Sequence, residues 1–460
     1  MNEIDGLSDQ KRVFDRDWTQ GSIVHNLMRL SWPMIVSMSI ITLGPVIEMV
    51  WMGRLGATSV AAAGVAGIVV QLLMGLMGGL TTGLRAVIAR HVGASDFQNA
   101  NNVAQQAFVI SAVFAVLAAL ASVFLPRPIL SMTGMEADVV AKATAYIQIV
   151  FAGMIFTAFG MISGSIMQSS GDTITPMKLS ILSRLFHLVL SPFLVFGWWI
   201  FPRLEVNGAA LTNVITGALS VTAGLWLLFS GRSRLRPTLR GFRLDPPTIW
   251  RIVRIGLPAS VSQVQWGVTE FLLMTFIAPF GTIPVAAHAI NQRVLMVLIL
   301  PGVALGQAAG VLVGQNLGAG QADRAEKVGW LAAGIMEVFA VICSVAILIW
   351  ADEIMHLFTN EPELIEMGSD FLRIASVGFF IIGFTLILQL SLEGAGDTTA
   401  MMVLGLVMVW VLQMPLAYFL SQIEEFGVYG VRWGLVASGL LGGFALPVYF
   451  RMGRWKRKAV

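Results

Sequence analysis

The sequence predicts an all-α integral membrane protein with twelve transmembrane helices, arranged as two six-helix bundles related by an internal pseudo-two-fold axis. Two observations predict this class. The chain of 460 residues is 56% hydrophobic and only 12% charged, whereas soluble domains carry about 25% charged residues. Its two halves also repeat one another in sequence.

Twelve apolar runs are each long enough to cross a hydrocarbon core about 30 Å thick. A transmembrane β-barrel is excluded, because its strands would alternate apolar and polar residues over about ten positions. The runs lie at 24–51, 58–84, 102–124, 140–168, 175–200, 206–230, 250–278, 283–313, 327–350, 368–392, 399–421 and 427–450.

The two halves align at an offset of 225 residues without a gap. An even number of helices in each half gives both halves the same orientation in the membrane, so the axis relating them runs along the membrane normal. Duplicated bundles are a common transporter design. The matching pairs are Pro33 and Pro258, Gly56 and Gly281, Val60-Ala-Ala and Val285-Ala-Ala, Gly93-Ala and Gly318-Ala, and Gly171-Asp-Thr and Gly396-Asp-Thr.

Arginines gather between the halves. The stretch from Ser230 to Arg254 carries seven arginines and one acid, and the C-terminal end adds five basic residues. By the positive-inside rule both segments are cytoplasmic, and twelve helices place the N-terminus there too. We therefore expect a multi-pass protein of the cell (inner) membrane. A nucleic-acid partner is not expected, since topology explains the arginines.

These boundaries predict five segments along the chain. They are a cytoplasmic N-terminal tail at 1–21, a first lobe at 22–230, a basic cytoplasmic linker at 231–250, a second lobe at 251–450 and a basic cytoplasmic tail at 451–460.

Glu48 interrupts the first apolar run. A charge at the centre of a transmembrane helix costs about 2.5–3.5 kcal/mol on insertion scales. A carboxylate retained there is protonated part of the time, paired with a cation, or in contact with water. Each of these states suits a protein that moves ions or solutes. The alternative is a glutamate that snorkels to the outer surface, since Arg54 lies only about 9 Å further along the helix.

Short motifs follow one another in a fixed order, most of them in both halves. They are Leu30-Ser-Trp-Pro33 with Ile255-Gly-Leu-Pro258, Val92-Gly-Ala-Ser-Asp96 with Asn316-Leu-Gly-Ala-Gly320, the Val-Ala-Ala and Gly-Asp-Thr pairs above, and Trp51-Met-Gly-Arg-Leu-Gly56, which closes the first helix. From about residue 22 to 450 the chain thus resembles the multidrug and toxic compound extrusion (MATE) family. The resemblance implies a two-lobed, monomeric antiporter in membrane lipid that needs no cofactor. Such antiporters export amphipathic, often cationic small molecules in exchange for H⁺ or Na⁺.

The resemblance also implies a coupling role for Glu48, because one branch of the family has an aspartate coupling acid at this place. Apart from Na⁺ at Glu48 in a sodium-coupled protein, no metal site is expected. Pro33, Gly44 and Pro45 weaken the hydrogen bonding of the same helix and permit bending. Protonation of Glu48 would then change both the charge and the curvature of the helix.

The family's partner positions for this acid map onto His187, Ser191 and Asn213. Ser191 stands where a second acid is usual in that branch, and His187 stands where an amide is usual. Histidine titrates near neutrality, so an acid beside a histidine favours proton coupling over sodium coupling. His187 as an ordinary packed residue is the alternative.

Glu270 is a second acid within an apolar run. Another branch of the family uses a glutamate in this seventh helix, at the place of Trp266, which shares a helix face with Glu270. That branch also uses an acid in the tenth helix, where this chain has Ile382. If Glu270 takes part in coupling, its expected polar neighbours are Gln263, Gln265 and Gln292.

Three further residues carry less weight. The resemblance assigns no role to Glu337, a third acid in an apolar run, and His288 is interpreted as a packing or loop-tethering residue. Arg184 is expected to snorkel or to pair near a helix end.

Other function classes find little support in the sequence. It has no phosphate-binding Gly-x4-Gly-Lys-Ser/Thr loop, no His/Cys metal cluster and no nucleophile elbow, which disfavours an enzyme or an ATP-driven pump. A lipid or lipid-linked oligosaccharide flippase of the same superfamily is the first alternative, although a polyanionic cargo would call for arginines in the cavity. A channel, which needs no coupling acid, is the second alternative.

Overall fold

The computed structural model describes residues 16–124, 126–131, 137–231, 233–238 and 242–458, and within them the secondary structure is helical, with no strand. The prediction of an all-α protein is confirmed. Parts of the predicted tails and linker lie outside the described residues, namely 1–15, 232, 239–241 and 459–460.

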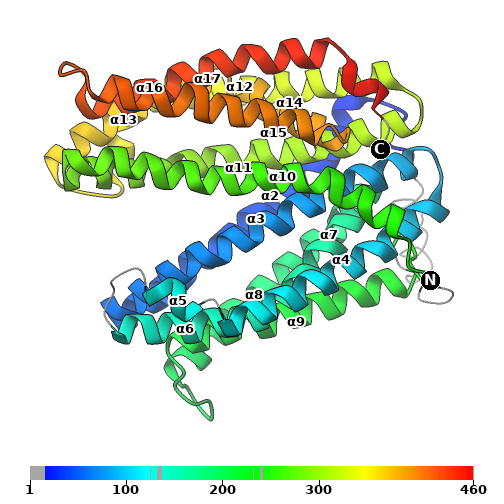
Figure 1. Cartoon of the computed structure of the whole chain (residues 1–460), viewed down its shortest axis with the longest axis horizontal. Helices are drawn as coiled ribbons and strands as arrows, with labels where there is room; N and C mark the ends of the chain where they lie inside the picture. The colour runs from blue at the N-terminus through cyan, green and yellow to red at the C-terminus, as the bar shows by residue number, and fades with distance from the viewer. Residues whose placement is uncertain (1–15, 125, 132–136, 232, 239–241, 459–460) are drawn as a thin grey trace, which may run out of the picture. The chain divides into compact units, whose positions relative to one another are not determined.

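The chain divides into two compact units. Unit 1 contains the residues up to Trp18 and Pro33–Ser260, and unit 2 contains Thr19–Trp32 and Val261–Val460. Helices α2 (Ile23–Leu55) and α10 (Pro246–Ile277) each continue from one unit into the other (Figure 1).

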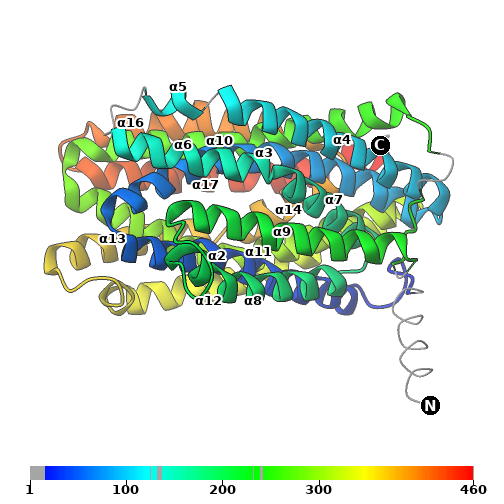
Figure 2. The same cartoon turned by 90° about the horizontal axis from the view of Figure 1, so that it is seen from below.

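The remaining helices of unit 1 are α3 (Ala57–Gly93), α4 (Phe97–Phe124), α5 (Pro126–Ser131), α6 (Ala137–Ala152), α7 (Met154–Ser170), α8 (Ile174–Phe196) and α9 (Val206–Phe229). Unit 2 contains α11 (Thr282–Gly318), α12 (Ala322–His356), α13 (Pro362–Phe379), α14 (Ile382–Gly394), α15 (Thr398–Leu406), the π-helical segment η2 (Val407–Gln413), α16 (Met414–Ser421), α17 (Gly427–Arg451) and the 3-10 turn η3 (Arg454–Arg457). In unit 1, α8 and α9 lie side by side (Figure 2).

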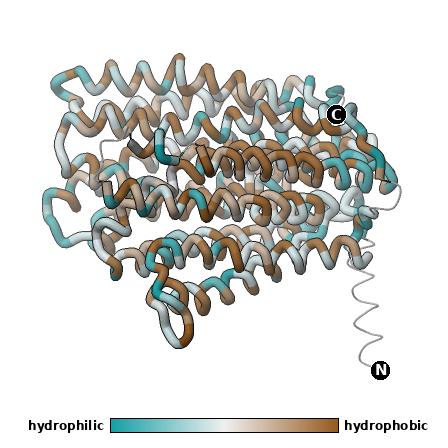
Figure 3. Tube along the Cα trace, turned by 60° about the horizontal axis from the view of Figure 1, so that its bottom comes forward, coloured by the Kyte–Doolittle hydropathy of each residue, from teal (hydrophilic) through white to brown (hydrophobic). Residues whose placement is uncertain are grey.

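Length and apolar composition make nine spans among the described residues able to cross a membrane, or up to eleven if each of two bent helix pairs forms one span. The remaining predicted segment, 250–278, lies in α10, which is long enough but carries Arg254, Gln263 and Gln265 in its apolar stretch. Hydrophobic residues line the helices and hydrophilic ones gather toward their ends and the connecting turns (Figure 3).

The sequence repeat is visible as a repeated break. In unit 1, α6 and α7 are bent by 45° at Gly153, and in unit 2, α13 and α14 are bent by 56° at the corresponding place. Each bent pair corresponds to one predicted segment, 140–168 or 368–392. A break leaves backbone amides at the start of the second helix without intrahelical partners, so both units must satisfy those amides in another way.

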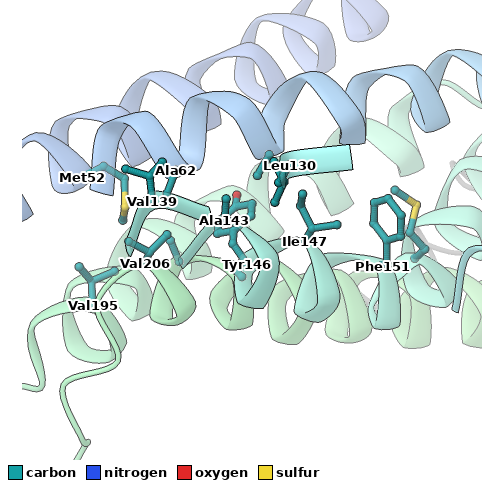
Figure 4. Close-up of a cluster of buried hydrophobic side chains, with 14 of the residues drawn as sticks. Met52, Ala62, Leu130, Val139, Ala143, Tyr146, Ile147, Phe151, Val195 and Val206 are labelled. Carbon is teal, nitrogen blue, oxygen red and sulfur yellow. The ribbon is translucent and has the colours of Figure 1, made fainter. Parts of the chain in front are cut away.

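Unit 1 has an apolar core formed by several helices (Figure 4). Met52 of α2 and Ala62 of α3 meet Leu130 of α5, side chains of α6 such as Tyr146, and Val206 of α9. Burial of large side chains here fixes which face of α2 points inward, and therefore where its polar residues lie.

In unit 2, glycines let α11 and α14 approach closely. A Cβ built on Gly394 would lie 2.3 Å from the carbonyl oxygen of Gly310, and one built on Gly306 would lie 2.4 Å from the side chain of Leu390. Small residues at helix interfaces are the usual means of tight packing in membranes, because backbones can then come into contact. This interface positions the start of α14.

Substituting Gly394 tests this interface. Gly394→Ala should lower the free energy of unfolding by about 1–3 kcal/mol, the range for overpacking a tight core, because the new methyl group must push α11 and α14 apart. Gly334→Ala in α12 is the matched control, since a Cβ there meets no atom within 4 Å. Thermal unfolding followed by size-exclusion chromatography in detergent measures both; equal midpoints would contradict the packing.

Candidate functional site

Glu48 faces the interior of unit 1. Met52, one turn further along α2, is buried in the apolar core, and residues four apart share a helix face. The Glu48 side chain is only 17% exposed. This geometry favours an inward-facing carboxylate over one that snorkels to the surface.

Side chains from two other helices hold one oxygen of this carboxylate. His187 Nε2 on α8 lies 3.1 Å from Glu48 Oε1, and Asn213 Nδ2 on α9 donates to the same oxygen at 2.5 Å. Both are among the partners predicted from the sequence. The second oxygen, Oε2, accepts no hydrogen bond from any described residue. The carboxylate is thus fixed in position while one oxygen remains open.

The surroundings of His187 indicate its protonation state. The residue is 1% exposed, and its Nδ1 has no hydrogen-bond partner within the described part of the chain. An ionised carboxylate can only accept hydrogen bonds, so we assign the imidazole proton to Nε2. A second proton on Nδ1 would bury an unpaired donor, which is costly. His187 therefore orients Glu48 through its Nε2 hydrogen bond, while Nδ1 takes no part in the contact.

The remaining predicted residues of this region have other contacts. Ser191 lies one turn beyond His187, is buried, and its Oγ has no hydrogen-bond partner among the described residues. Gly44 lies against Arg184, because a Cβ at Gly44 would be 2.0 Å from Arg184 Nη1. The guanidinium also donates to the Ile41 carbonyl at 3.4 Å and interacts electrostatically with Glu48. Helix α2 continues unbroken through Pro33 and Pro45.

A second carboxylate cluster lies in unit 2, around Glu270. His288 Nε2 on α11 lies 2.8 Å from Glu270 Oε1, and Gln292 Nε2 donates to Oε2 at 2.6 Å. Both oxygens are therefore occupied. Of the other two expected neighbours, Gln265 instead donates to the Gly405 carbonyl at 3.0 Å, and Gln263 is exposed with no hydrogen bond to a described residue.

Arg432 on α17 completes this second cluster, and sequence analysis missed it. It is 3% exposed, lies 4.4 Å from the ring centroid of Phe371, and interacts electrostatically with Glu270. His288, interpreted from the sequence as a packing or tethering residue, also belongs here. A buried arginine in an otherwise apolar run was the available signal for Arg432, and the spacing of four residues between His288 and Gln292 was the signal for a shared face on α11.

Comparisons with known proteins agree on one family. The model of the MatE family matches residues 33–193 and 258–419, which is more than half of the chain. The chain is 23% identical over 460 residues to a probable multidrug resistance protein, YoeA, of Bacillus subtilis, covering 98% of each chain. It is 24% identical to a FAD transporter of Shewanella oneidensis, covering 91% of this chain and 92% of that one.

Solved structures show the same fold. A MOP superfamily transporter from Pyrococcus furiosus superposes with a TM-score of 0.89 at 24% identity, covering 96% of this chain and 98% of that one. Together with the apolar spans, the family match identifies a multi-pass membrane protein with the twelve-helix, two-lobed fold predicted from the sequence.

The buried arginine generates a stability prediction. Arg432→Met removes the buried cation that lies over the Phe371 ring and interacts electrostatically with Glu270. It should lower the free energy of unfolding by about 0.5–2 kcal/mol, the range for a cation–π contact from an exposed to a desolvated site. The double variant Glu270→Gln with Arg432→Met should recover a large part of this loss, because no uncompensated charge remains. Thermal unfolding in detergent measures the series.

Arg293→Met is the matched control, because Arg293 lies on the neighbouring helix α11 but is exposed. It should change stability by less than about 0.5 kcal/mol, as surface substitutions do. Additive effects of the Glu270 and Arg432 changes would show that the two charges are not coupled.

Proposed function

Because the chain belongs to the MatE family, it is a membrane transporter for the export of small molecules rather than an enzyme, and we propose that it is a cation-coupled antiporter in which Glu48 binds the coupling ion. The two lobes would give access to the two sides of the membrane in turn. The observation that carries this proposal is the uneven hydrogen bonding of the Glu48 carboxylate. Oε1 is within hydrogen-bond distance of both His187 and Asn213, whereas Oε2 accepts no hydrogen bond from a described residue.

The two clusters differ in a way that favours Glu48. Each oxygen of Glu270 already accepts one hydrogen bond, and the buried Arg432 interacts electrostatically with this carboxylate. Oε2 of Glu48, by contrast, accepts no hydrogen bond from a described residue. Glu48 can take a cation on Oε2 without losing His187 or Asn213. We therefore place coupling in unit 1 and assign Glu270 to holding α10, α11 and α17 together.

The donors around Glu48 support H⁺ rather than Na⁺ as the coupling ion. Hard metal cations prefer several oxygen ligands, whereas the groups nearest Glu48 are the N–H donors of His187 and Asn213. The described residues also contain no group of three or more His, Cys, Asp or Glu side chains arranged to hold a metal ion. A proton needs only the open oxygen.

The contacts of the tails support a common side for both termini. In unit 2, Arg324 donates to the Gly21 carbonyl at 2.7 Å, and Lys456 contacts Asp323 and Glu326, so Gly21 and Lys456 both lie at the first turns of α12. The positive-inside rule makes this side cytoplasmic. We propose that the protein resides in the inner membrane as a monomer.

The proposed cargo is an amphipathic cationic or neutral compound, which Glu48 attracts when it is ionised. One relative is named a FAD transporter, and FAD carries phosphates. An anionic cargo, as for a lipid flippase of the same superfamily, is therefore the alternative to test. A channel is the second alternative, and it would conduct without exchange for a counter-ion.

Neutralising Glu48 should stop coupled transport. In proteoliposomes with an imposed pH gradient, Glu48→Gln should reduce uptake of a lipophilic organic cation at least tenfold, because an amide keeps the shape but cannot take up a proton. Glu270→Gln is the matched variant in unit 2, and it should retain most of the activity. Full activity in Glu48→Gln would remove Glu48 from coupling, and loss only in Glu270→Gln would move coupling to unit 2.

The choice of ion is tested separately on the wild-type protein. A pH gradient alone should drive transport, whereas a sodium gradient at equal pH on both sides should not, because the site lacks oxygen ligands for Na⁺. The same assay with FAD and with a neutral amphipathic compound distinguishes the cargo classes. Sodium-driven transport without a pH gradient would contradict the proton assignment.

A further inference from the structure

Glu337 in unit 2 lies beside the break between α13 and α14. It lies on α12, in an otherwise apolar stretch, and its carboxylate meets the start of α14, immediately after the 56° break from α13. A Cβ built on Gly383 would lie 2.6 Å from the backbone nitrogen and 2.6 Å from Oε2 of Glu337. Only a residue without a side chain leaves room for the carboxylate here.

The carboxylate faces the free amides of α14. No side chain of α14's own N-terminal segment caps the helix, and the backbone N–H groups of Gly383 and Phe384 are those that act on Glu337. These are the second and third residues of the helix, the amides that a cap normally receives. A negative charge at this end is also favoured by the helix dipole. Glu337 thus places a carboxylate from another helix at the N-terminal end of α14.

At this end of α14, Glu337 Oε2 is buried and accepts no hydrogen bond of normal length from a described residue. A buried acceptor without a donor is costly, and a proton on this oxygen would remove the charge. The start of α14 therefore lies beside a group that is itself able to take up a proton.

Other charged groups lie too far away to fix the charge of Glu337. The neighbouring side chains of α14, such as Leu386 and Phe384, are apolar, and no charged residue acts on Glu337. Gly383 on α14 lies against Glu337, and Gly302 on α11 lies against its neighbour Met336, so separations along the chain can be counted from these two glycines. Arg293 is nine residues before Gly302. Arg373 and Glu393 are each ten residues from Gly383. At 1.5 Å per residue these separations are about 13–15 Å.

The repeat provides an internal control for this feature. At the offset of 225 residues, Ala112 stands at the place of Glu337 and Ala158 at the place of Gly383. Unit 1 nevertheless forms the same break, between α6 and α7. The fold therefore makes the bend without a carboxylate, so Glu337 has a purpose beyond forming it.

We propose that Glu337 is a proton-binding group that controls the bend between α13 and α14. In the ionised state its charge stabilises the N-terminal end of α14 through the helix dipole, and on protonation this stabilisation is lost and the bend loosens. The use of this motion during export rests on the function proposed above, whereas the proton-dependent bend itself does not. Glu337 is a positioning residue, since it acts through α14.

Hydrogen–deuterium exchange on the full chain in lipid nanodiscs tests the bend. After correction for the intrinsic pH dependence, exchange of the segment 381–386 should rise roughly two- to thirtyfold on acidification, the effect of a charge at a helix terminus. Glu337→Gln should exchange at the fast rate at every pH. Glu337→Asp retains a charge and should retain a pH dependence. The matched control is Glu353→Gln on the same helix, where the carboxylate is exposed, and it should behave as wild type.

Exchange of this segment that does not change with pH in the wild type would overturn the proposal, whether or not the variants fold. So would a pH-dependent Glu337→Gln. Transport by the same variants is measured alongside. Normal exchange behaviour with no coupled transport would instead count against the function proposed above, so the two failures can be told apart.

Discussion

A carboxylate within the apolar bundle of unit 1 is the constraint around which that unit is organised. Glu48 is kept there by two donors on one oxygen, from His187 on α8 and Asn213 on α9. These bonds tie α2 to the bundle by polar contacts, next to the apolar core that contains Met52. If the oxygen that remains open takes up a proton, the strength of both bonds changes, so the attachment of α2 depends on the charge state of one side chain.

In unit 2, a carboxylate within the helical bundle is stabilised by a different set of contacts. Glu270 has both oxygens occupied and a buried arginine nearby, so its charge is balanced within the protein. The carboxylate that is left incompletely satisfied there is Glu337, at the start of α14. Each unit thus contains a glutamate within an apolar run that has an oxygen no described residue satisfies: Glu48 on the continuous helix α2, and Glu337 on α12 next to the broken pair α13 and α14.

The fold could be predicted from sequence because hydropathy and the repeat at 225 residues are local, countable patterns. The family register led us to expect His187 and Asn213 near Glu48, and both side chains lie within hydrogen-bond distance of it. Arg432 was missed because the register predicts no charge there, and its proximity to Glu270 arises only when α17 packs against α10 and α11. Glu337 was left without a role for a related reason. It lies against the backbone of Gly383, and a contact with a backbone group cannot be predicted from residue types in the sequence.

The two glutamate–histidine clusters can also be compared through the repeat. If both had been inherited from the ancestral half, they would occupy matching positions, yet Leu273 stands at the repeat position of Glu48 and Pro45 at that of Glu270. Their histidines come from non-equivalent helices, α8 in one case and α11 in the other. The two polar clusters therefore do not correspond under the repeat, so the helix arrangement that the two halves share does not depend on either cluster standing at one fixed position.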